Sequence, residues 1–113
     1  MFGLTGVMKF YYMPSVTDMR LGYARLSEIV KLQYGRNPRN GDVYMFISKD
    51  RRRIRLFRYE YEAYYLYEKY FDRGLSFMKI EYTDEHKIKG YKMDWNDLVL
   101  LLECPTRKVL KCR

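Results

Sequence analysis

The sequence is poor in the residues that build disulfide frameworks and metal centres, because its 113 residues include two cysteines and one histidine. Cys104 and Cys112 are too few and lie too late in the chain for a disulfide framework or a zinc site. His86 lies in a polar segment without a cysteine or serine nucleophile motif beside it. We therefore expect no enzyme activity, no cofactor and no metal site.

The sequence also lacks a long hydrophobic run, since no stretch reaches the roughly 18 to 20 apolar residues that span a bilayer. Its first seven residues, Met-Phe-Gly-Leu-Thr-Gly-Val, include no basic residue of the kind that begins a secretory leader. We therefore expect a soluble, unsecreted protein without a membrane partner. A reducing cytoplasm fits the two cysteines, so a cytoplasmic location is predicted.

One enzymatic alternative comes from Glu85 and Lys87, which flank His86 and have Asp72 upstream, like the end of a metal-dependent nuclease pattern. Two-metal chemistry needs carboxylates that converge on a rigid site. These residues are predicted to lie in a loop, so the nuclease interpretation is disfavoured.

Apolar residues are plentiful, at 48% of the chain, and 18% of the residues are aromatic. A chain of this length is sufficient for one hydrophobic core and too short for two ordinary domains. We predict a single α+β domain over residues 1–105, followed by a basic C-terminal tail over residues 106–113.

Periodicity and turn residues predict the order strand, helix, several strands, helix. The first helix is amphipathic, about four turns long, and begins at Ser15 and Asp18, which have the spacing of a capping box. Residues 63–71 also fit a helical stripe, but Tyr65, Leu66 and Tyr67 favour a strand. The predicted strands are 9–13, 42–48, 53–59, 63–71 and 76–82; a looser turn is expected over 48–52, a polar loop over 83–91 and a second helix from Asp94 to Pro105. This order predicts a small antiparallel sheet of about four to five strands.

The formal charge of +8 is unevenly distributed along the chain. Residues 43–58 carry a net +5 and residues 105–113 a net +4, so these two segments hold more than the whole net charge. A field depends on where the charges lie, and guanidinium groups suit phosphate oxygens. The first partner to consider is therefore nucleic acid.

The candidate nucleic-acid-binding residues lie at the turn and along the following strand: Lys49, Arg51, Arg52, Arg53, Arg55 and Arg58. The period of two places Arg53 and Arg55 on one face of the sheet and allows Arg51 to share it, with Ile54 and Leu56 on the other face. Arg58 breaks this alternation. Contacts to phosphate would give affinity without reading sequence. The alternative is a solvated hairpin whose charges discourage edge-to-edge association.

Three other features allow a functional and a structural interpretation. The basic residues of the tail, Arg107, Lys108, Lys111 and Arg113, suit either a flexible electrostatic arm or an ordinary solvated terminus. For Asp18 and Arg20 a structural role in the first helical turn is favoured. Packing is favoured over base stacking for a series of tyrosines, because so small a domain needs large side chains inside: Tyr59, Tyr61, Tyr64, Tyr65, Tyr67 and Tyr70. Glu60, Glu62 and Glu68 lie among them and would repel nucleic acid, so this face is not expected to be the main contact.

Five segments resemble a known family. They are 1–4 (Met-Phe-Gly-Leu), 17–22 (Thr-Asp-Met-Arg-Leu-Gly), 37–46 (Asn-Pro-Arg-Asn-Gly-Asp-Val-Tyr-Met-Phe), 51–59 and 65–74. The chain resembles the TnpB-like accessory proteins encoded by the second open reading frame of the IS66 group of bacterial insertion sequences. That family usually has tryptophan where Tyr59 stands, a glycine near Glu62 or Ala63, and a Lys-Arg pair at Lys69-Tyr70.

The resemblance implies an accessory protein of transposition, produced beside a separate large transposase, and brings no catalytic residues. Together with the charge pattern it predicts a non-enzymatic protein that binds the DNA backbone through its basic hairpin. The alternative is a protein-interaction subunit that docks on the cognate transposase without direct DNA contact. No oligomeric state is indicated.

Overall fold

Five strands form one sheet, in the order β4-β3-β2-β1-β6, and two more strands, β5 and β7, form a second small sheet. The computed structural model describes residues 3–83, 90–103 and 109–111. The elements are β1 (Phe10–Tyr12), α1 (Tyr23–Leu32), β2 (Val43–Ile47), β3 (Arg53–Glu60), β4 (Ala63–Tyr70), β5 (Lys79–Glu81), β6 (Tyr91–Met93), α2 (Trp95–Glu103) and β7 (Val109–Lys111). The predicted α+β class, with one helix after the first strand and one near the C-terminus, is confirmed.

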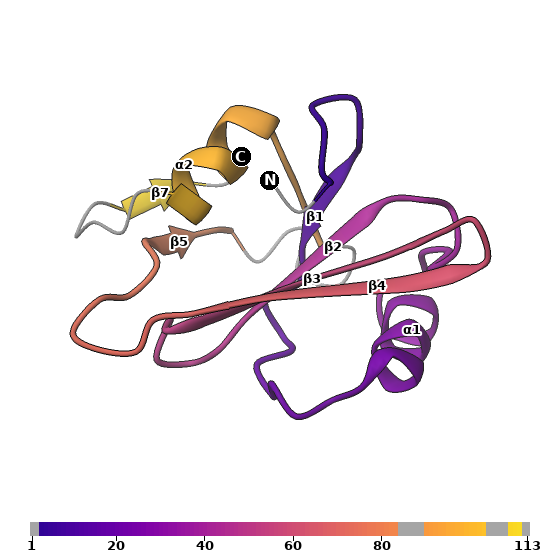
Figure 1. Cartoon of the computed structure of the whole chain (residues 1–113), viewed down its shortest axis with the longest axis horizontal. Coiled ribbons are helices and arrows are strands. Elements are labelled where there is room, and N and C mark those ends of the chain that lie inside the picture. Colours follow the sequence, from indigo (N-terminus) through magenta and orange to yellow (C-terminus); the bar gives the residue numbers. More distant parts are fainter. Residues whose placement is uncertain (1–2, 84–89, 104–108, 112–113) are drawn as a thin grey trace.

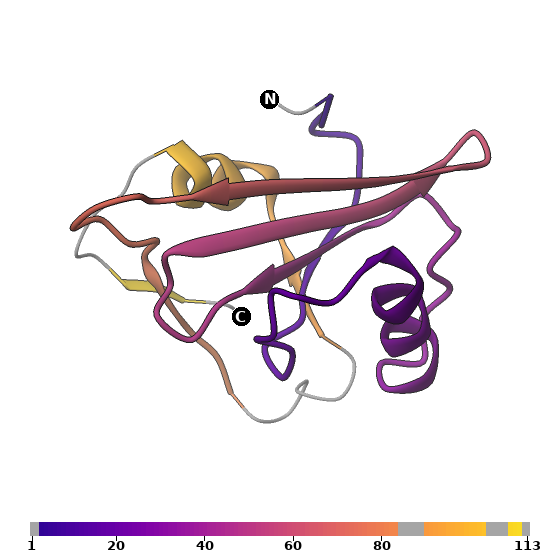
Figure 2. The same cartoon turned by 60° about the horizontal axis from the view of Figure 1, so that its bottom comes forward.

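The five-stranded sheet lies between α1 on one face and α2 with the small sheet on the other (Figures 1 and 2). Alternating side chains of β3 reach both layers: Ile54 and Leu56 pack in the core beside α2, and Phe57 packs in the core beside α1. Strand β2 is buried along its whole length, as its continuous apolar run predicts.

The sheet is mixed, whereas the sequence predicts an antiparallel one. Strands β1 and β2 pair in parallel, with Phe10 opposite Val43, and the other three pairs of the large sheet are antiparallel. A parallel pair needs a crossover of a dozen or more residues, and the segment 13–42 with its helix supplies one. A helix between two strands is compatible with parallel or antiparallel pairing of those strands, so the sequence did not decide between the two.

Helix α1 begins at Tyr23, later than the predicted start at Ser15 and Asp18. The Asp18 carboxylate instead accepts the backbone N–H of Arg20 at 2.9 Å, and the Ser15 hydroxyl bonds the hydroxyl of Tyr34. These local bonds compete with the helix for the capping side chains. Gly22 occupies the N-cap position without a side-chain hydrogen bond.

Two turns set the ends of β3. The predicted looser turn after β2 is confirmed: Ser48 N–H donates to Arg53 O at 3.0 Å, and Arg51 has a φ of 57°. At the other end, β4 follows β3 after only Tyr61 and Glu62, whose φ angles are 50° and 60°. Positive φ at both central residues is the geometry of a type I′ hairpin turn.

The C-terminal part contains two strands that the sequence pattern does not predict. Strand β6 begins at Tyr91, at the end of the predicted polar loop, and three residues of the predicted tail form β7, which pairs in parallel with β5. The predicted second helix is confirmed as α2, where Leu98 N–H donates to Asp94 O at 3.0 Å. Three-residue strands carry too little pattern to be recognised from sequence.

Candidate nucleic-acid interface

The basic residues predicted to bind nucleic acid occupy different environments in the structure. Lys49 is exposed in the turn after β2, while Arg51, Arg52 and Arg53 are partly exposed. Arg55 and Arg58 are 8% and 7% exposed. The exposed positive charge therefore lies in residues 49–53, at the turn between β2 and β3, whereas the arginines farther along β3 are buried.

Arg55 is held inside the protein by the segment that precedes α1. Its Nη1 donates to Met19 O at 3.1 Å and to Leu21 O, and its Nε lies 3.9 Å from the Glu68 carboxylate. Burial lowers the pKa of its guanidinium, although Glu68 acts in the opposite direction. This arginine connects β3 to the approach of α1.

Arg58 lies on the opposite face of the sheet from Arg55, as its break in the sequence alternation indicates. Its Nη1 bonds the Glu60 carboxylate, and its guanidinium lies 4.5 Å from the centre of the Tyr65 ring. Both groups belong to the same hairpin, so Arg58 supports the pairing of β3 with β4.

Arg52 and Arg53 hold the end of β4 against the hairpin. Arg52 donates to Phe71 O at 3.2 and 3.0 Å, and Arg53 Nε lies 3.3 Å from the Glu68 carboxylate. Their guanidinium carbons lie 5.5 and 4.6 Å from the centre of the Tyr70 ring. Both side chains remain partly exposed while they make these contacts.

Three basic side chains surround a shallow cavity of about 210 Å³ between the hairpin and β5. Lys49, Arg51 and Lys79 contribute to its lining, and none of its lining residues is acidic. In the part of the chain that the structure describes, no hydrogen bond or ion pair engages these three side chains. Lys79 could not be predicted from sequence, because one lysine on a short strand gives no signal until the fold places it beside the hairpin.

The one acidic residue of the turn, Asp50, organises the loop. Its carboxylate accepts the Ser48 hydroxyl at 2.7 Å and the Arg52 N–H at 3.0 Å. The Ser48 bond, followed by the Arg52 N–H, lowers the pKa of Asp50, so it stays ionised. Its side chain therefore fixes the loop that presents Lys49 and Arg51.

Asp18 and Arg20 form an exposed local pair before α1. Arg20 Nε and Nη2 donate to the two carboxylate oxygens at 3.0 Å each, and the side-chain bond to Arg20 is the main reason that the pKa of Asp18 falls to about 2. The pair stabilises the turn that precedes α1, so its role is structural, but the predicted place in the first helical turn is wrong, because the helix begins only at Tyr23.

The tyrosines divide between packing and exposure. Tyr64 packs against Phe57 and Tyr59 with ring centres 5.7 and 4.9 Å apart, and the hydrogen bond from Arg39 is the main cause that lowers its pKa. Tyr61 is 87% exposed and Tyr70 is 53% exposed. Packing thus accounts for Tyr64, whereas no ring contact involves Tyr61 among the described residues.

Several predicted features lie outside the described residues: Glu85, His86, Lys87, Pro105, Arg107, Lys108, Arg113 and both cysteines. Within the described ranges no three His, Cys, Asp or Glu residues are grouped so as to hold a metal ion. Neither of the described helices is long and apolar enough to cross a membrane.

Comparison with known proteins gives one result. The sequence model of the family described as IS66 Orf2-like proteins matches residues 8–111, which is most of the chain. No curated protein and no solved structure matches the chain.

Proposed function

The chain belongs to the family of IS66 Orf2-like proteins, whose members have an accessory role in insertion sequences, and we propose that it serves transposition by binding the DNA backbone. Contact is made by the basic end of the β2–β3 hairpin together with β5. The protein contributes binding and no covalent chemistry.

The observation that carries this proposal is the cavity that Lys49, Arg51 and Lys79 help to line, because none of its lining residues is acidic. Charges that remain unneutralised by the protein are the ones that replace condensed counterions on DNA. Arg52 and Arg53, by contrast, already bond carbonyl and carboxylate groups. We therefore assign Arg52 and Arg53 chiefly to shaping the hairpin. The exposed N–H groups of their guanidiniums can also contact phosphate.

Arg55 and Arg58 support the interface from inside. Both are buried and bonded to protein groups, so a phosphate could reach them only if those bonds broke. Contacts limited to phosphates position a protein on duplex DNA without specifying sequence. Binding by the hairpin alone is thus expected to be nearly independent of sequence.

The test measures affinity for a mixed-sequence duplex between low and physiological salt. Lys49, Arg51 and Lys79 are replaced together by Gln in one variant, and in the matched control the exposed Arg20, Arg25 and Lys31 are replaced by Gln. Each lost phosphate contact lowers the salt slope by about 0.9, so the first variant should lose about 2 to 3 from the slope. Equal slopes in the two variants would overturn the proposal.

A second candidate function is docking on the transposase. Strand β4 is one of the two outer strands of the described large sheet, and an outer strand can accept a strand from another chain. A pull-down with the cognate transposase in the presence of nuclease separates the two functions. Retention after DNA digestion favours docking, and loss favours a bridge made by DNA.

A further inference from the structure

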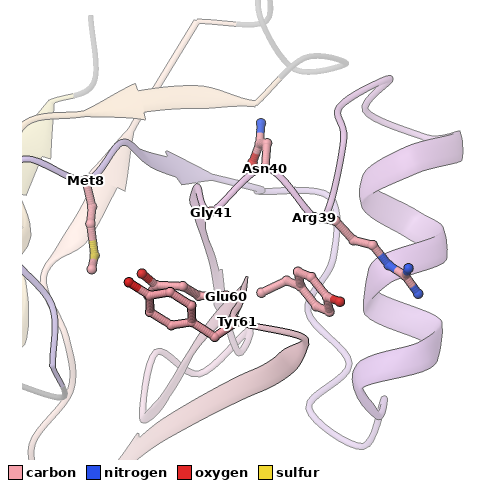
Figure 3. A pocket seen from close by; sticks show the side chains of 7 residues that line it. Met8, Arg39, Asn40, Gly41, Glu60 and Tyr61 are labelled. Carbon is pink, nitrogen blue, oxygen red and sulfur yellow. The ribbon is translucent and has the colours of Figure 1, made fainter.

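A second cavity, of about 360 Å³, lies at the end of β3 opposite the basic hairpin. Met8, the loop that follows α1 and the β3–β4 turn contribute to it. Figure 3 shows Tyr61 and Glu60 on the side of Met8, and the Arg39 side chain extending from the loop toward α1. The volume is within the range of small-molecule sites, about 300 to 1,000 Å³. The cavity therefore has room for a planar ring.

Tyr61 is placed at a cost to the fold. Its side chain is 87% exposed, and its φ of 50° is in the left-handed region, which a bulky residue rarely adopts. In the described part of the chain no ring contact or hydrogen bond involves it. Asn-Gly is the favoured pair in such a turn, so neither packing nor turn geometry accounts for this tyrosine. Strain of this kind is concentrated at functional sites.

Arg39 supplies a positive charge beside Tyr59 and Tyr64. Its guanidinium lies 5.1 Å from the centre of the Tyr59 ring, and its Nε and Nη2 donate to the Tyr64 hydroxyl at 3.3 and 3.2 Å. The side chain is otherwise exposed. A guanidinium held in this way can still meet an anion with its outer edge.

Hydrogen bonds of Tyr44 and Asn37 fix the loop that carries Arg39. The Tyr44 hydroxyl donates to Asn37 O at 3.0 Å, and the Asn37 side chain accepts the Arg39 N–H at 2.9 Å. Burial raises the pKa of Tyr44 to about 12, so its hydroxyl keeps the proton that it donates. The position of Arg39 is thus set before any ligand arrives.

Glu60 is the acidic residue of the cavity, and its charge is offset. One of its carboxylate oxygens bonds Arg58 Nη1, an arginine that is itself buried. The second oxygen can accept a hydrogen bond, as carboxylates do from the amino group of cytosine. The Tyr61 ring and the Glu60 acceptor on one side of the cavity suit a nucleobase, and the Arg39 guanidinium on the other side suits a phosphate of the same strand.

We propose that this cavity takes one unpaired nucleobase of a DNA strand, which stacks on Tyr61 while Arg39 contacts the adjoining phosphate. The inference rests on the proposed DNA-binding function. The two sites lie at opposite ends of β3, whose eight residues span roughly 23 Å at about 3.3 Å per residue. DNA that meets both sites runs along the sheet, with duplex at the hairpin and an opened strand at Tyr61. The preferred ligand is therefore a junction between duplex and single strand.

The experiment uses a duplex with a short single-stranded overhang that contains 2-aminopurine, whose fluorescence falls when the base stacks. Wild-type protein should quench the probe and bind it more tightly than the blunt duplex. Tyr61→Ala and Tyr61→Asn should abolish quenching and lower the affinity for the overhang about tenfold, within the range supplied by one base stack. Tyr61→Phe should retain both, and Tyr70→Ala, which removes an exposed tyrosine at the other end of the sheet, should retain quenching.

The same probes separate this inference from the proposed function. The variant in which Gln replaces Lys49, Arg51 and Lys79 should bind blunt duplex weakly and still quench at saturating protein. Quenching of a free single strand without any duplex binding would support the cavity and reject the hairpin site. Quenching that persists in Tyr61→Asn, or the absence of quenching in the wild type, would overturn the inference. A side chain of a partner protein would then be the expected occupant of the cavity.

Discussion

Arg55 is an arginine whose main contacts are with its own chain. Its guanidinium donates to two carbonyl groups, those of Met19 and Leu21, and its charge lies near Glu68. A carbonyl that loses its donor in a half-buried place has to be hydrated or left unsatisfied. The side chain thus contributes to stability through the groups that it satisfies, beyond its own burial.

We predict that Arg55→Met lowers the free energy of unfolding by about 2 kcal/mol, because two carbonyl groups lose their donor while the apolar stem is preserved. Urea unfolding followed by circular dichroism measures the change. Arg53→Met is the control: its ion pair with Glu68 is partly exposed and should contribute less than about 1 kcal/mol. A stable Arg55→Met protein with lost DNA affinity would contradict the structural role.

At the level of residues, the period of two predicted which side chains of β3 share a face. Arg53 and Arg55 both lie near Glu68, and Ile54 and Leu56 enter the opposite core. The burial of Arg55 could not be predicted, since its acceptors come from a segment more than thirty residues away in the sequence. Lys79 joined the candidate site for the same reason, through a contact made by the fold.

Among the elements, the β3–β4 turn has the clearest conflict between sequence and geometry. Tyr61 and Glu62 both adopt positive φ, which costs a residue with a side chain about 1 to 2 kcal/mol. The flanking pair, Glu60 opposite Ala63, keeps the two strands in register. The turn is therefore maintained by the long hairpin and not by its own residues.

We predict that replacing Tyr61 by Asn and Glu62 by Gly stabilises the protein by about 1 to 2 kcal/mol, because this pair adopts a type I′ turn readily. Calorimetry should show a rise in Tm of at least about 4 °C. The same variant should lose 2-aminopurine quenching. Tyr61→Ser, which removes the ring and keeps the side-chain strain, should not raise Tm; an equal rise would mean that exposure of the ring, and not the turn, is the unfavourable feature.

Sequence patterns identified the elements better than their connections. The continuous run of β2 and the apolar positions of α2 predicted both elements, since burial alone imposes those patterns. The start of α1 was wrong because Asp18 bonds Arg20 N–H within a turn, a choice between two local partners that spacing does not decide. Parallel pairing of β1 with β2 depended on the fold of the whole chain.

On the scale of the whole molecule, one sheet separates two hydrophobic cores. Leu26 and Ile29 of α1 pack in one core, and Leu98 of α2 packs in the other. The single tryptophan, Trp95, packs against the second core, with its ring 5.6 Å from that of Phe10. Its fluorescence therefore reports on the face of the sheet opposite α1.

We predict that Leu26→Ala shifts unfolding by Trp95 fluorescence and by circular dichroism to the same extent, although Leu26 lies in the other core. Truncation of this buried leucine, 1% exposed, should cost about 2 to 5 kcal/mol, and Ile29→Val about 0.5 to 1.5 kcal/mol if the first variant is too unstable. Leu32→Ala, at a position that is 71% exposed, is the control and should leave both midpoints unchanged.

The reason for this coupling is the alternation along β3. Leu56 belongs to the core beside α2 and its neighbour Phe57 to the core beside α1, so the strand cannot leave one core without disrupting the other. A fluorescence midpoint that stays at the wild-type value while circular dichroism shows an earlier transition would contradict this, and would make α1 a separately unfolding unit. Coincident midpoints mean that one cooperative structure holds both proposed sites, the basic cavity lined by Lys49, Arg51 and Lys79 and the cavity beside Tyr61, at the two ends of β3.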